Sequence, residues 1–204
     1  MMPDFDGAAH YALTRLENDL PPNLFYHGVK HTRDDVVPAA QRLAQYENIR
    51  GESRLLLLTA AWYHDVGFIE RPTDNEVLAV ETAYEMLPGF GYTPQHLQVI
   101  RGIIMATKWP QSPHTLLEQI MADADLDSLG RDDFLCTSLS LRDEIQATGA
   151  EIDLLEWYKG QIEFLSAHEY FTAAAHALRT ANKYRNINML EDLIAQGIPD
   201  AACE

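Results

Sequence analysis

Apolar residues recur along most of this chain at the three- and four-residue spacing that is typical of amphipathic helices. No segment alternates between apolar and polar residues for long enough to predict a strand. Proline and glycine stand between the periodic segments and predict where helices end. The pattern therefore predicts an all-α fold of about 8–10 helices over residues 1–204. We expect helices near 13–20, 32–44, 53–66, 77–87, 93–104, 116–129, 132–148, 152–165 and 170–195, the last with a break near Asn182.

One of these predicted helices differs from the others because it is apolar on nearly all sides, from Leu55 to Trp62. Such a helix is expected to be buried. It leads directly into His64 and Asp65. An ionised carboxylate in apolar surroundings costs several kcal/mol unless it is paired or bound to a metal. A metal site at the end of this helix would remove that cost.

Other metal-ligating residue types occur at a distance from this pair. His31 lies about one helix upstream, where Thr32 is expected to cap a helix. Asp123, Asp125 and Asp127 follow about sixty residues downstream, in an otherwise apolar segment. Imidazole nitrogens combined with carboxylate oxygens suit a divalent transition metal better than magnesium.

Composition excludes several other classes of protein. The 204 residues carry 31 acidic and 15 basic side chains, a formal net charge of −16, which disfavours binding to nucleic acid polymers or anionic membranes. No signal-peptide pattern or apolar run of transmembrane length is present. The two cysteines, Cys136 and Cys203, are far apart, so neither a disulfide framework nor a thiolate zinc site is expected. These features predict a cytoplasmic protein.

Three segments together resemble the metal-binding pattern of the HD superfamily of phosphohydrolases. They are YHGVKHT at 26–32, AAWYHDVGF at 60–68 and IMADADLDSLG at 120–130. The resemblance covers roughly residues 24–145 and points to the small, stand-alone bacterial type. It implies a single all-helical HD-type domain, with the helices of residues 150–197 packed on the motif core, a central metal, and hydrolysis of phosphate esters. The GYP signature of cyclic-dinucleotide phosphodiesterases is missing.

The resemblance also implies a ligand set. Its positions correspond to His31, His64, Asp65 and Asp125, the last because it follows Ala124 as in the family's motif. Asp123 is the alternative ligand, or it orients a ligand without touching the metal. The two aspartates are about 200° apart around a helix, so both cannot easily face one metal. Asp127 is expected to cap a helix or to face solvent.

Related proteins with two metals carry further histidines, and this sequence departs from them. Asn75 and Lys108 occupy the positions where those histidines would stand. One divalent metal is therefore expected, namely Mn, Fe, Ni, Co or Zn, with Mg less favoured.

The expected activity is hydrolysis of a small phosphomonoester, such as a nucleotide, by metal-activated water. The expected catalytic residues are Asp65, Asp125 and Lys108, and the expected substrate-binding residues are His27, Arg33, Arg71 and Lys108. A small phosphorylated substrate needs few cations, which suits so acidic a chain. Two alternatives remain open, a non-catalytic signalling or scaffold module on the HD fold and an HD-type metal oxygenase. The sequence also leaves a homodimer open.

Overall fold

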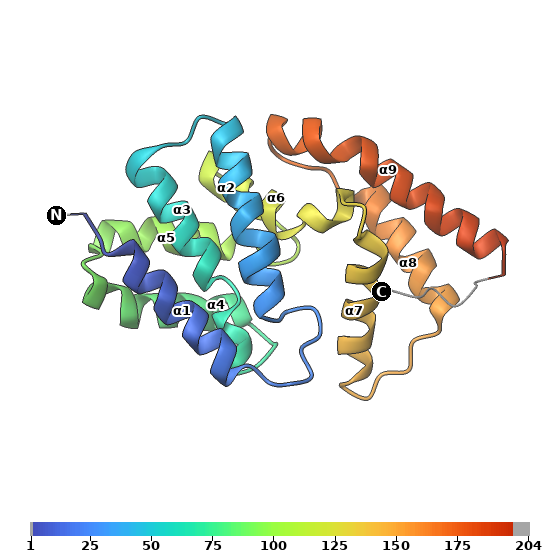
Figure 1. Ribbon diagram of the computed structural model, residues 1–204, viewed down its shortest axis with the longest axis horizontal. Coiled ribbons are helices and arrows are strands. Elements are labelled where there is room, and N and C mark those ends of the chain that lie inside the picture. Colours follow the sequence, from blue (N-terminus) through green and yellow to red (C-terminus); the bar gives the residue numbers. More distant parts are fainter. Residues whose placement is uncertain (1, 198–204) are drawn as a thin grey trace. The chain divides into compact units, whose positions relative to one another are not determined.

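A computed structural model describes residues 2–197, and within this range the chain forms helices and loops without any strand. Nine α-helices, α1 to α9, account for most of it (Figure 1). The prediction of an all-α fold of about 8–10 helices is confirmed. The chain divides into two compact units, Met1–Leu126 and Asp127–Glu204, which we describe separately. The expectation of one single domain stays a prediction.

The first unit contains six α-helices and three shorter helical turns. In chain order they are α1 (Phe5–Asp19), the π-helical turn η1 (His31–Val36), α2 (Val37–Tyr46), α3 (Gly51–Tyr63), the 3-10 turn η2 (Val66–Ile69), α4 (Asn75–Met86), the 3-10 turn η3 (Leu87–Phe90), α5 (Pro94–Met105) and α6 (Leu116–Asp125).

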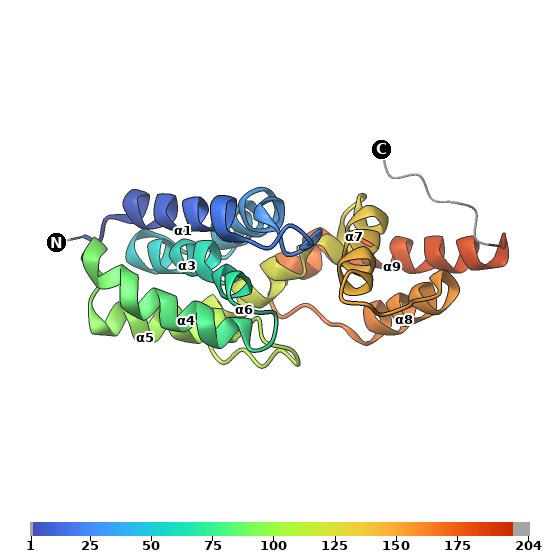
Figure 2. The same cartoon turned by 90° about the horizontal axis from the view of Figure 1, so that it is seen from below.

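Helix α3 forms the centre of this unit. It packs against α1, α2, α5 and α6, and Figure 2 shows it between α1 on one side and α4 and α5 on the other. Leu57, Ala60 and Ala61 are completely buried, in agreement with the apolar pattern on all sides of this segment. Burial of this helix fixes the position of the two residues that follow it, His64 and Asp65.

Two helix ends near the motifs differ from the prediction. Thr32 does not begin a helix, because the helical turn already starts at His31 and Thr32 is buried inside it. Helix α6 ends at Asp125, four residues earlier than predicted, and a separate 3-10 turn follows it. Asp125 is thus the last residue of α6. No further turn of α6 follows it, so its side chain is not confined to one face of a regular helix.

The second unit contains the 3-10 turn η4 (Asp127–Gly130) and three helices, α7 (Phe134–Gln146), α8 (Leu154–Ala167) and α9 (Ala173–Ala195). Helix α9 is continuous, so the predicted break near Asn182 is wrong. It packs along α8 and against η4. At η4 the approach is close, since a Cβ atom on Gly130 would collide with the backbone of Arg179.

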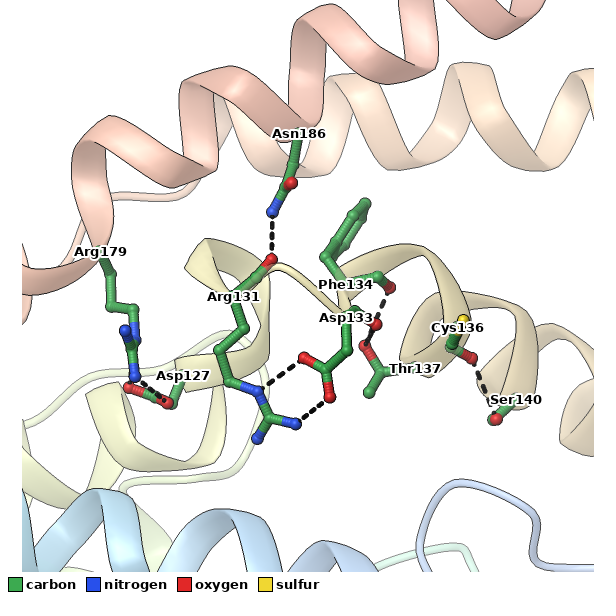
Figure 3. A network of polar contacts seen from close by, with 9 residues as sticks. All are labelled: Asp127, Arg131, Asp133, Phe134, Cys136, Thr137, Ser140, Arg179 and Asn186. Atoms are coloured by element: carbon green, nitrogen blue, oxygen red, sulfur yellow. Dashed lines mark hydrogen bonds and ion pairs between the residues drawn. The ribbon is translucent and has the colours of Figure 1, made fainter. Parts of the chain in front are cut away.

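Polar contacts fasten α9 to η4 in this unit, as Figure 3 shows. Arg179 donates from Nε and Nη2 to the two carboxylate oxygens of Asp127 at 2.8 and 2.9 Å. Asn186 donates to the carbonyl oxygens of Leu129 and Arg131, both at 2.9 Å. Asp127 is buried, so the expectation that it faces solvent is wrong, and the alternative that it caps a helix stays a prediction. Its role is to hold two parts of the second unit together.

Two further observations bear on expectations from the sequence. Cys136 on α7 is disulfide-bonded, although no disulfide framework was expected from the sequence, and Cys203 lies outside the described residues. None of the helices within residues 2–197 is both long enough and apolar enough to cross a membrane.

Candidate metal centre

Three helical elements of the first unit bring the predicted ligands together. His31 is the first residue of η1, His64 and Asp65 directly follow α3, and Asp125 is the last residue of α6. Contacts among α3, α6 and η1 hold these three ends side by side. Residues that are about thirty and sixty positions apart in the sequence therefore meet at one place.

The side chains of these four residues form one compact cluster. His31, His64 and Asp65 each offer one ligand atom, and these atoms lie within 4.8 Å of one another. Oδ2 of Asp65 is 3.2 Å from Nε2 of His64 and 3.6 Å from Nε2 of His31. Oδ1 of Asp125 is 3.2 Å from Nε2 of His31 and 3.5 Å from Nε2 of His64. Both imidazoles thus direct Nε2 toward both carboxylates.

The hydrogen bond on the far side of the His64 ring determines its tautomer. Nδ1 lies 2.8 Å from the carbonyl oxygen of Ala61, and because a carbonyl only accepts, Nδ1 is the donor. In the neutral ring Nε2 then carries a lone pair, as a metal ligand requires. Nε2 of His64 and Oδ2 of Asp65 are buried and have no hydrogen-bond partner among the described residues. Such unpaired buried atoms are costly unless something else binds them.

The electrostatics of the cluster show that its charges depend on one another. Burial by itself lowers the pKa of His64, but Asp65 and Asp125 outweigh it and raise this pKa well above the ordinary value. Burial raises the pKa of Asp125, but the imidazoles of His31 and His64 beside it more than reverse this and hold it far below the ordinary value. The pKa of Asp65 is lowered too, because the adjacent His64 outweighs the effect of burial. Both aspartates are therefore carboxylates that need a positive charge beside them.

This donor set fits a divalent metal. Two aspartates balance the charge of a 2+ ion, and two neutral imidazoles complete a mixed nitrogen and oxygen set that first-row transition metals favour. The side chain of Asp125 is 18% exposed, whereas those of His31, His64 and Asp65 are at most 7% exposed. The cluster is therefore open on the side of Asp125, which leaves room for ligands that the protein does not supply.

The two aspartates between which the sequence left a choice have different positions. Oδ1 of Asp125 lies within 3.5 Å of Nε2 of both His31 and His64. Asp123 is buried within α6 and makes its own interactions. The geometry therefore supports Asp125 as the ligand.

An aromatic wall stands beside the cluster, formed by Tyr26, His27 and Phe68. The ring of His27 stacks on Phe68 with a centroid distance of 4.2 Å, and it lies 5.9 Å from the ring of His31. Tyr26 packs 4.7 Å from His31. His27 is half-buried, so the structure places this predicted substrate-binding residue at the edge of the cluster.

The predicted phosphate-binding cations are placed differently from His27. Lys108 donates to the carboxylate of Asp74 at 3.0 Å, and its side chain is 43% exposed. This single hydrogen bond lowers the pKa of Asp74 and raises the pKa of Lys108. Arg71 is exposed and donates to the carbonyl oxygen of Thr73. Lys108 can therefore bind another anion only by giving up its bond with Asp74.

Arg33 also has acidic partners. It donates twice to Asp34 at 2.8 Å and lies 3.9 Å from Glu17. Asn75, one of the two residues that replace a histidine of two-metal relatives, is buried at the start of α4.

Two residues beside the cluster, Tyr26 and Phe68, were missing from the sequence prediction, and so was Asp74, the partner of Lys108. Phe68 follows Asp65 by three residues, so a helical turn after the His-Asp pair would have placed both on one side. Tyr26 adjoins His27 in the motif. Asp74 carries no such signal, because its pairing with Lys108 joins residues 34 positions apart.

Comparisons with known proteins give structural matches. No model of a known protein family matches this sequence, and no curated protein matches it. A crystal structure described as a predicted HD superfamily hydrolase, from an uncultured Thermotogales bacterium, matches with a TM-score of 0.65 and 16% identity over 95% of this chain and 93% of that one. A crystal structure from Lactobacillus plantarum matches with a TM-score of 0.67 and 20% identity over 95% of this chain and 97% of that one. The chain therefore has the all-helical HD-domain fold that its motifs indicate.

Proposed function

We propose that this protein is a hydrolase that uses one divalent transition metal to cleave a small phosphomonoester. The observation that carries the proposal is the buried set of His31, His64, Asp65 and Asp125, in which Nε2 of His64 and Oδ2 of Asp65 lack hydrogen-bond partners among the described residues. The fold likeness to a crystal structure described as a predicted HD superfamily hydrolase supports the same class of reaction.

A metal bound by these residues would supply a Lewis acid toward water and toward a phosphoryl oxygen. The protein's own groups would do the rest. His64 is held by Ala61 with Nε2 toward the centre of the cluster, and Asp65 and Asp125 provide negative charge that balances the ion. Asp125, on the open side, would accept a proton from the attacking water.

The substrate would enter from the open side and meet the aromatic wall. His27 stacks on Phe68, which fixes its ring beside His31 and allows a polar contact with the substrate. Lys108 would exchange Asp74 for a phosphate oxygen. Most cations near the site are already paired, and the chain carries a net charge of −16. One phosphate group is therefore easier to bind than three, and a monophosphate is the favoured substrate.

The proposal is tested with metal-depleted protein that is reloaded separately with Mn, Fe, Co, Ni, Zn or Mg. Release of inorganic phosphate is measured with nucleoside monophosphates, sugar phosphates and the corresponding nucleoside triphosphates. We expect turnover of monophosphates with at least one transition metal, and none with the Asp125→Ala variant. Tight binding of metal without phosphate release from any substrate would contradict the proposal and favour a scaffold. Oxygen consumption by the iron-loaded protein would favour an oxygenase.

A further inference from the structure

A second site lies at the other end of the hairpin that α2 and α3 form. A cavity of about 230 Å³ opens there, lined by Gln41, Gln45, Asn48, Ile49, Arg50 and Arg54. Helix α3 begins beside this cavity and ends at His64, so its length places the cavity about 20 Å from the metal cluster. The cavity is thus separate from the candidate metal centre.

The two arginines of this cavity have no acidic partner among the described residues. Arg15, Arg33, Arg131, Arg142 and Arg179 each lie within 4 Å of a carboxylate. With 31 acidic side chains to 15 basic ones, an arginine of this protein has many carboxylates to choose from. Two unpaired guanidinium groups in one hollow therefore form a local positive site on an acidic protein.

The nearest acidic residues in sequence do not cancel this charge. Neither Glu47 nor Glu52 lines the cavity. Glu52 lies 3.2 Å from Nε2 of His96, on another helix. Arg50 is the N-cap residue of α3, and its side chain makes no capping hydrogen bond, so the first backbone N–H groups of the helix add positive potential at this end.

The remaining lining residues offer neutral hydrogen-bond donors. Gln41 and Gln45 are four residues apart on α2 and therefore share one face of that helix. The loop that carries Asn48 is held by backbone hydrogen bonds from Asn48 to Gln45 and from Ile49 to Ala44, at 3.2 and 2.8 Å. The donors therefore stand on fixed backbone, which reduces the entropy lost on binding.

We propose that this cavity binds a phosphate group, either as inorganic phosphate or as part of a small organic phosphate. Arg50 and Arg54 are the principal contacts, because guanidinium groups match phosphate oxygens in charge and in paired hydrogen-bond geometry. The carboxamides of Gln41 and Gln45 complete the donor set. Binding here is independent of the proposed hydrolysis, because it requires no metal ligand.

The test is a titration of the ¹⁵N-labelled, metal-loaded protein, followed by amide chemical shifts of residues 48–54. The probes are inorganic phosphate and adenosine monophosphate, the latter as its non-hydrolysable methylenephosphonate analogue, each at constant ionic strength up to about 20 mM, a range that covers millimolar affinity. We expect saturable shifts at these amides. Arg50→Gln and Arg54→Gln should each weaken the affinity by about tenfold or more, as the loss of a charge-assisted contact does. Arg185→Gln, which removes an exposed arginine of α9, should leave the affinity unchanged.

The two probes distinguish the source of the phosphate group. Tighter binding of adenosine monophosphate indicates an organic phosphate as the ligand, and equal binding indicates that the phosphate group alone is recognised. The absence of saturable shifts at residues 48–54 with both probes overturns the proposal. So does an unchanged affinity in the Arg50→Gln, Arg54→Gln double variant. Shifts near His31 or His64 are recorded separately, so loss of hydrolysis and loss of this site are distinguishable.

Discussion

The carbonyl oxygen of Ala61, three residues before His64 in the last turn of α3, accepts a hydrogen bond from Nδ1 of His64 at 2.8 Å. This contact keeps the proton of the neutral ring on Nδ1 and turns Nε2 toward Asp65 and Asp125. A backbone carbonyl in a buried helix cannot move away, so the ring orientation is set by the fold itself. His64 is therefore held in the orientation and tautomer that a metal ligand requires.

We predict one transition metal for each chain, and we predict that His64→Ala or Asp65→Ala abolishes metal binding and phosphate release together. Each substitution removes a ligand and leaves the remaining charges of a buried cluster unbalanced. Elemental analysis after gel filtration measures the stoichiometry. His10→Ala is the control, since His10 is exposed on α1 and should keep a full complement of metal. Two metals per chain at full occupancy would contradict the prediction.

Substitution of the two neighbouring aspartates should have unequal effects. Asp125→Ala should remove the metal, because Asp125 reaches both histidines. Asp123→Ala should retain most of it, with affinity lowered by about 10–100-fold at most, as when a residue supports a ligand without binding the ion. Competition with a chromogenic chelator measures both affinities. The reverse order, with metal lost from Asp123→Ala and kept in Asp125→Ala, would show that the assignment is wrong.

Substitutions of Lys108 and of its partner Asp74 should change KM in opposite directions. Lys108→Ala should raise KM or lower kcat for a phosphomonoester by about tenfold or more, because a charge-assisted contact is lost. Asp74→Asn should lower KM, because it frees the ammonium group and removes a competing carboxylate. Steady-state kinetics of both variants provide the measurement. Lys159→Ala is a matched control, a lysine paired with Glu156 on α8. Unaltered kinetics of Lys108→Ala would remove Lys108 from the substrate site.

Gly67 is predicted to be essential for packing behind the His-Asp pair. A Cβ atom at this position would collide with the backbone of Asn75, where η2 meets α4. Gly67→Ala should therefore lower the free energy of unfolding by about 1–3 kcal/mol, the usual range for overpacking. Gly160→Ala, on α8 with open space at its Cβ, should be neutral or raise it by about 0.5–1 kcal/mol. Urea denaturation measures both variants. Equal stability of the two variants would contradict this account of Gly67.

His168 is predicted to make stability fall as the solution becomes acidic. Burial, with Lys183 and His176 nearby, lowers its pKa from 6.5 to about 4, and neither ring nitrogen has a hydrogen-bond partner among the described residues. Between about pH 6.5 and 4 the unfolded chain binds a proton that the folded chain does not. The free energy of unfolding is therefore unaffected by titration of His168 above pH 6.5 and falls as the pH is lowered toward 4. The loss amounts to on the order of 1–3 kcal/mol.

The His168→Phe variant provides the comparison, since it keeps an aromatic ring and removes the titrating group. Denaturant unfolding of wild type and variant across pH 4–7 isolates the effect, because the carboxylates contribute equally to both. We expect the wild type to lose more stability than the variant over this range. Parallel pH profiles would show that His168 does not titrate as described.

Local pattern in the sequence determined the fold class and pointed to the His-Asp pair at the end of a buried helix. Helical periodicity requires only neighbouring residues, and the apolar segment from Leu55 to Trp62 correctly predicted a buried helix that leads to His64 and Asp65. A carboxylate at the end of such a helix needs a partner, so a charged site could be predicted from local sequence alone. The preference for Asp125 over Asp123 came from the motif, and the distances in the structure support it.

Tertiary structure decided what depends on residues distant in sequence. The burial of Asp127 follows from Arg179, which lies 52 positions away, and the partner of Lys108 is Asp74, 34 positions away. The cavity with Arg50 and Arg54 exists only because the end of α2 and the start of α3 are held together. A side chain's partner is set by which surfaces pack against each other, and packing is a property of the whole fold, whereas helix formation and burial of an apolar segment are dictated by residues within a few turns.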